Sequence, residues 1–122
     1  MSVLNVNDQI QLLFMTSANE SLINTVWEKA TIVEGFNPDM WRKDFAGAWL
    51  LRDQFGLSSD YGWDVCLLVP ISHGGTNDID NLYPIQWENQ RRKSNHFPLF
   101  KTAVTANGEK NVHMEQLWKI QE

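Results

Sequence analysis

A run of three basic residues is the first candidate for chemistry in this sequence. The run consists of Arg91, Arg92 and Lys93. It lies in a stretch, Gln86 to Lys101, that holds four Lys/Arg against one acidic residue, although the whole chain has a net charge of −5. The acidic balance argues against a protein that coats DNA, because phosphate binding depends largely on basic surface. The run itself fits either phosphate contact or a solvated helix end, where cations suit the helix dipole.

The single cysteine, Cys66, is the second candidate. One cysteine excludes an internal disulfide and a Cys-rich zinc cluster, and it is compatible with a reducing cytoplasm. The first ten residues lack a basic segment followed by an apolar run, so we expect no signal peptide. Residues 12–15 are apolar but far too short to span a bilayer. We therefore expect a cytoplasmic protein that does not bind a membrane.

The elements that position these residues can be predicted from residues 58–94. Turn-forming residues at 58–62 lead into an apolar strand over 63–69, which ends at Pro70. A loop rich in turn formers follows at 72–78, then a short strand over 82–85. A polar helix over 87–94 carries the basic run.

The flanking segments predict further elements. We expect helices over 8–15 and 20–30, the second with Asn19 as N-cap, and a short extended piece over 31–33. Residues 41–44 are expected to form a turn or the start of a helix, followed by an apolar segment over 48–51. Residues 97–118 are expected to form a hairpin that turns at Asn107-Gly108, with a final strand or helix.

The order strand, glycine-rich loop, short strand and basic helix matches a known family pattern. Residues 61–94 read Y-G-W-D-V-C-L-L-V-P-I-S-H-G-G-T-N-D-I-D-N-L-Y-P-I-Q-W-E-N-Q-R-R-K-S. This stretch resembles the HNH endonucleases, whose fold is called ββα-metal. The upstream W-R-K-D-F-A-G-A-W, residues 41–49, resembles the lead-in of small stand-alone members. The resemblance covers roughly 41–95, and the combination of motifs in order is far more specific than any one of them.

The resemblance implies roles for particular residues. In that family a divalent metal stabilises the scissile phosphate, and a histidine on the first strand takes a proton from the attacking water. Asn81 falls on the asparagine that ties the loop, and Asn89 falls on the metal-binding position of the helix. Cys66 stands where the metal-binding aspartate belongs, and Leu67 stands where the general-base histidine belongs. Loss of such a base removes a contribution of roughly 10²–10⁴-fold in rate.

Replacement groups for this site can be sought nearby. Asp64 lies two residues before Cys66 on the same face of the strand, and it is a candidate metal ligand together with Asn89. His73 in the loop and His96 after the helix are candidate substitutes for the base, although an exposed loop imidazole is the simpler interpretation. Cys66 and Leu67 are themselves interpreted as core residues, with a reactive or metal-binding Cys66 as the alternative.

Three functional hypotheses follow. The first is a catalytically degenerate HNH homologue that binds nucleic acid, through Arg91, Arg92 and Lys93, or a protein partner, without cutting. It needs no cofactor. The second is an active endonuclease with relocated base and ligands, which would use Mg²⁺ or another divalent ion. The third is a protein-interaction domain that uses only the scaffold, since a fold does not fix a function.

The expected fold class is α+β in one domain spanning residues 1–122. It is expected to consist of an N-terminal helical part (1–40), a ββα-metal core (41–95) and a hairpin-like C-terminal extension (96–122). The six tryptophans are expected to pack in the core rather than to stack on bases.

Overall fold

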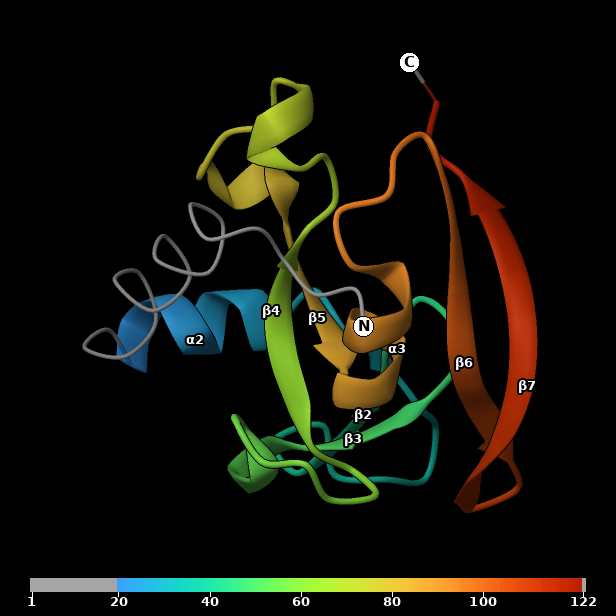
Figure 1. Ribbon diagram of the computed structural model, residues 1–122. Coiled ribbons are helices and arrows are strands. Elements are labelled where there is room, and N and C mark those ends of the chain that lie inside the picture. Colours follow the sequence, from blue (N-terminus) through green and yellow to red (C-terminus); the bar gives the residue numbers. More distant parts are fainter. Residues whose placement is uncertain (1–19, 122) are drawn as a thin grey trace.

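Seven strands and two α-helices make up the α+β fold of residues 20–121, the part of the chain that the computed structural model describes (Figure 1). The expected helix over 8–15 and the N-cap Asn19 lie outside these residues. The elements, in chain order, are α2 (Glu20–Trp27), β1 (Thr31–Ile32), β2 (Trp41–Lys43), β3 (Trp49–Leu51), β4 (Trp63–Leu67), β5 (Leu82–Gln86), α3 (Trp87–Lys93), β6 (Leu99–Asn107) and β7 (Lys110–Lys119). The strands form three antiparallel sheets, ordered β1-β2-β3, β4-β5 and β6-β7.

The hairpin of β4 and β5 lies at the centre, with α2 on one side and α3 on the other (Figure 1). Apolar residues of α2 recur at helical spacing and pack against the alternate residues of β4 that face them. The resulting core includes Ile23, Val26, Trp27, Trp63, Val65, Leu67 and Leu82. Trp27 and Trp63 contact each other with ring centroids 5.2 Å apart, and Trp63 is fully buried. The prediction that the tryptophans pack in the core is confirmed for Trp27, Trp49 and Trp63, whereas Trp41, Trp87 and Trp118 are half-buried.

Three of the four residues of the segment 41–44 form a strand, β2 (Trp41–Lys43), so the prediction of a turn or helix start there is wrong. β2 pairs with both β1 and β3, which places Arg42 opposite Leu50. The guanidinium of Arg42 is buried and donates to the carbonyls of Pro38 and Glu28. A buried arginine that bonds to distant backbone oxygens is a tertiary feature, and local sequence pattern does not reveal it.

The C-terminal hairpin is long, and one of its two edges is covered. β6 pairs with β7, and the two-residue turn lies at Gly108-Glu109, one residue later than predicted. Along the other edge of β6, the Ala106 N–H donates to the carbonyl of Gly47, in the turn between β2 and β3. Gly47 has φ +90°, and a Cβ there would lie 2.6 Å from the hydroxyl oxygen of Thr105, so this close approach requires glycine.

The remaining sequence predictions agree with the structure to within a few residues. The helix expected over 20–30 ends at Trp27, the strand expected over 63–69 ends at Leu67, and the helix expected over 87–94 ends at Lys93. Within the described part of the chain, no helix is long and apolar enough to cross a membrane.

Candidate functional site

The candidate site is the unit formed by β4, the loop 68–81, β5 and α3. The two strands pair in antiparallel register, with Cys66 opposite Tyr83 and Leu67 opposite Leu82. α3 begins directly after β5, because the Gln86 side chain caps it by accepting from the backbone N–H groups of Glu88 and Asn89. The strand, loop, strand and helix predicted from the sequence are therefore present in the predicted order.

Asn81 fixes the loop between the two strands. Its Oδ1 accepts from the Val69 N–H at 2.8 Å. Its Nδ2 donates to the carbonyl oxygens of Val69 at 2.9 Å and Thr76 at 2.8 Å. One amide thus joins the two ends of the exposed loop, and these hydrogen bonds agree with the architectural role that the resemblance implies for Asn81.

Cys66 and Leu67 are both buried, as the interpretation of them as core residues predicted. Cys66 is 0% exposed and Leu67 is 1% exposed. Because side chains alternate along a strand, Leu67 shares a face with Trp63 and Val65 and joins the core beneath α2. Cys66 faces the opposite way, with Asp64. The two positions that would carry the base and the metal-binding carboxylate therefore point to different faces, and neither side chain reaches solvent.

Burial raises the pKa of the Cys66 thiol to about 11, and the nearby ammonium of Lys93 only partly opposes this effect. A thiol with such a pKa is protonated at neutral pH, whereas the nucleophile and metal ligand is the thiolate. The structure therefore gives no support to a reactive or metal-binding Cys66.

Asn89 is committed to structural hydrogen bonds. Its Oδ1 accepts from the N–H groups of Ala103 and Val104, both at 2.7 Å. Its Nδ2 donates to the carbonyl of Val104 and to Oδ2 of Asp44, both at 3.1 Å. An amide offers two donor and two acceptor positions, so all four are used. This corrects the expectation that Asn89 binds a metal ion, because its oxygen already serves β6.

Asp44 completes this polar cluster, and its role was not predicted. Oδ1 accepts from the N–H groups of Ala46 and Ala48, at 3.0 and 2.8 Å. Oδ2 accepts from the Gln86 N–H at 3.0 Å as well as from Asn89. Burial raises the pKa of Asp44, while these hydrogen bonds lower it in part. The sequence does contain a sign of this role: Asp44 directly precedes the turn that begins at Phe45, and Asp commonly accepts hydrogen bonds from the backbone N–H groups of a following turn.

The three residues of the basic run have three different environments. Lys93 is 0% exposed, and its Nζ donates to the Leu67 carbonyl at 3.1 Å, so the prediction that Lys93 contacts phosphate is wrong. Arg92 forms an ion pair with Glu115 of β7. Arg91 is exposed and lies over the ring of Trp87, 4.9 Å from its centroid. Only Arg91 and Arg92 remain at the surface.

The proposed substitutes for the lost groups do not form a metal site. His73 is exposed, with Nδ1 3.2 Å from the Ser72 hydroxyl and its ring against Phe97. His96 is exposed as well. Asp64, the candidate metal ligand on β4, is half-buried, and this burial raises the pKa of its carboxyl group. Among residues 20–121, no group of three or more His, Cys, Asp and Glu side chains could hold a metal ion.

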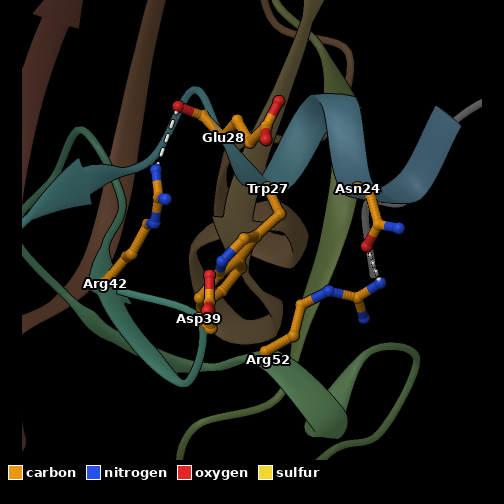
Figure 2. A pocket seen from close by; sticks show the side chains of 6 residues that line it. All are labelled: Asn24, Trp27, Glu28, Asp39, Arg42 and Arg52. Atoms are coloured by element: carbon orange, nitrogen blue, oxygen red, sulfur yellow. Dashed lines mark hydrogen bonds between the residues drawn. The ribbon is translucent and has the colours of Figure 1, made fainter. Parts of the chain in front are cut away.

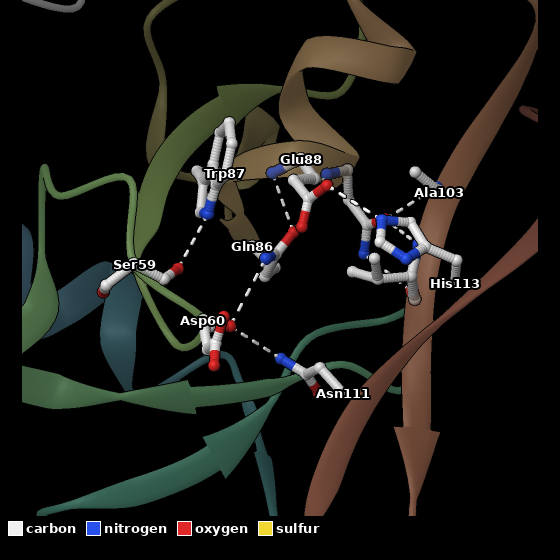
Figure 3. Close-up of polar contacts among 10 residues, drawn as sticks. Ser59, Asp60, Gln86, Trp87, Glu88, Ala103, Asn111 and His113 are labelled. Carbon is white, nitrogen blue, oxygen red and sulfur yellow. Dashed lines mark hydrogen bonds and ion pairs between the residues drawn. The ribbon is translucent and has the colours of Figure 1, made fainter.

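Further polar contacts tie α3 to its neighbours (Figure 3). Glu88 pairs with His113 of β7 at 3.1 Å, and the Trp87 indole N–H donates to the Ser59 carbonyl at 2.7 Å. Nδ2 of Asn111 and Nε2 of Gln86 both donate to the Asp60 carbonyl. α3 is therefore held to β7 on one side and to the loop before β4 on the other.

Comparisons with known proteins found no relative: no family model matches the chain, and neither a curated protein nor a solved structure matches it.

Proposed function

We propose that this chain is an HNH-type ββα domain that binds a partner without cutting nucleic acid. The observation that carries the proposal is the burial of Leu67 beneath α2, since this is the position at which the family pattern has its general base. A leucine there can neither accept a proton nor reach a substrate. The proposal is supported further by Asn89, whose amide is fully used by β6 and Asp44.

A protein is the favoured partner. Electrostatic attraction to phosphate requires exposed cations, and only two of the three residues in the basic run are exposed. Arg92 is paired with Glu115, which leaves Arg91 over Trp87 as the remaining candidate contact. The net charge of −5 adds repulsion at longer range. Nucleic acid binding through Arg91 and Arg92 is the second candidate, since a guanidinium stacked on an indole is an arrangement that can also hold a base.

A plasmid-nicking assay with Mg²⁺, Mn²⁺, Ni²⁺ and Zn²⁺ tests the absence of cutting. We expect no nicking with any of these ions. Nicking that requires metal, and that disappears in a folded variant with both His73 and His96 changed to Ala, would instead support the relocated nuclease.

Salt-dependent DNA binding separates the two classes of partner. For a protein-binding domain we expect no measurable affinity for duplex DNA at low salt. Saturable binding whose salt dependence weakens in the double variant Arg91→Ala, Arg92→Ala, but not in Lys119→Ala on the exposed hairpin, would establish nucleic acid as the partner.

A further inference from the structure

A cavity of about 460 Å³ lies away from the ββα unit, between α2 and the segment 38–52 (Figure 2). Its lining comes from α2 and the residue that follows it, from the turn before β2, from β2 itself, and from the residue that follows β3. The lining residues are Asn24, Trp27, Glu28, Asp39, Arg42 and Arg52. This volume is within the range of small-molecule binding sites in proteins.

Arg42 is a buried cation without a carboxylate partner in the described part of the chain. It is 8% exposed. Its Nε donates to the Pro38 carbonyl, and its Nη1 donates to the carbonyls of Glu28 and Ala30 just beyond the end of α2. Its Nη2 has no acceptor among residues 20–121. Backbone carbonyls offset part of the cost of burying this charge, but the positive charge itself is not neutralised.

Arg52 supplies a second guanidinium on the opposite side of the cavity (Figure 2). Its side chain is 19% exposed. Only Nη2 is engaged with side chains, by donating to Glu20 and Asn24. The two guanidinium groups lie beside the contacting tryptophan pair, since Arg42 is 5.8 Å from the ring centroid of Trp27 and Arg52 is 5.8 Å from that of Trp63. The cavity therefore combines the small exposed part of Trp27 with two guanidinium groups whose donors are only partly used, and one of these groups is paired with Glu20.

Two carboxylates, those of Glu28 and Asp39, also line the cavity. Both residues are exposed, and neither forms an ion pair with a described residue. Water and salt screen exposed charges strongly, whereas a buried guanidinium is screened much less. Arg52 is already paired with the exposed Glu20, so the buried charge that has no ion-pair partner among the described residues is that of Arg42, and it favours an anion beside it.

We propose that this cavity is a binding site for a small molecule carrying an oxyanion, either a carboxylate or a phosphate. The planar guanidinium groups match both kinds of oxygen geometry and form charge-assisted hydrogen bonds to them. The oxyanion binds at Nη2 of Arg42, and the body of the ligand lies against Trp27 and extends toward Arg52. This site is independent of the proposed function of the ββα unit.

The test follows the indole N–H signal of Trp27 by NMR during titration of the full chain with inorganic phosphate, with citrate, and with potassium chloride at matched ionic strength. We expect a saturable shift with phosphate or with citrate and none with chloride. Saturation by only one of the two anions assigns the ligand class. An Arg52→Gln variant should weaken the affinity for citrate, whose further carboxylates extend toward Arg52, by about tenfold or more, the loss expected for a hydrogen bond to a charged group. The control Lys119→Gln, at an exposed position of the C-terminal hairpin, should bind as the wild type does.

Arg52→Gln is preferred to a change at Arg42, because Arg42 also holds three backbone carbonyls and its variants can fail to fold. The proposal is overturned if neither anion gives a saturable shift, if chloride gives the same shift, or if Arg52→Gln binds citrate with wild-type affinity.

Discussion

Replacing Asn89 by alanine separates a structural asparagine from a metal ligand. The amide of Asn89 serves the N–H and the carbonyl of Val104, the N–H of Ala103, and Oδ2 of Asp44. In Asn89→Ala the N–H and the carbonyl of the buried Val104 both lose this partner. Each buried polar group left without a hydrogen bond costs about 1–3 kcal/mol. With a smaller contribution from the half-buried Ala103, we expect a loss of about 3–5 kcal/mol in the free energy of unfolding.

Such a loss is large against a total stability of about 5–15 kcal/mol for a domain, so it is measurable by urea unfolding followed by tryptophan fluorescence. The control Asn107→Ala, at an exposed position beside the hairpin turn, should change stability by about 0.5 kcal/mol or less. Adding Mn²⁺ should not raise the unfolding midpoint of the wild type. The reasoning is refuted if Asn89→Ala unfolds at the wild-type midpoint, or if Mn²⁺ stabilises the wild type and not the variant, as expected of a ligand that binds only the native state.

Three further predictions follow from the same residues. The double variant Cys66→Asp, Leu67→His should not nick plasmid with Mg²⁺ or Mn²⁺. It should also unfold more easily than the wild type, because both positions are buried. Metal-dependent nicking by the variant would contradict this prediction. The pKa of Cys66 is about 11 in the folded chain against 9.0 for a free thiol, so the unfolded state loses its proton first. The free energy of unfolding should therefore fall as pH rises through this interval, by up to about 1.4 kcal/mol per pH unit beyond any fall seen in Cys66→Ala. Urea unfolding of both proteins at about pH 8 and about pH 10 measures this difference. Equal falls in the two proteins would rule out the thiol as the cause. Asn81→Ala should speed proteolytic cleavage within residues 70–80, which peptide mapping detects, since the loop loses three hydrogen bonds; cleavage at the wild-type rate would show that other contacts hold it.

Local patterns predicted the elements of the candidate site well. β4, β5 and α3 are each defined by a short apolar or polar run with turn-forming residues beside it, and these signals depend on neighbours in sequence. The role of Asn81 came instead from the resemblance to the family pattern, and its hydrogen bonds to Val69 and Thr76 agree with that role.

The polar cluster could not be predicted in the same way. Asp44 and Asn89 are 45 residues apart, and no periodicity connects them. The burial of Lys93 was equally hidden, since lysine is rarely buried in proteins. One signal was available: Lys93 is four residues after Asn89, so the two side chains lie on the same face of α3. Recognising that face as buried would have removed Lys93 from the set of phosphate contacts.

The hydrogen bonds between α3 and β6 determine whether the ββα unit could fold when it is separated from the rest of the chain. In a chain cut after the helix, at residue 95, the amide of Asn89 would lose three of its four partners, which all come from Ala103 and Val104. The ring of Phe45 would lose both Phe100 and Trp118. The C-terminal hairpin is thus an internal support of the motif rather than an appendage to it. Grafting the motif into another protein, or trimming this chain to its most recognisable part, would discard the surface against which the helix is built.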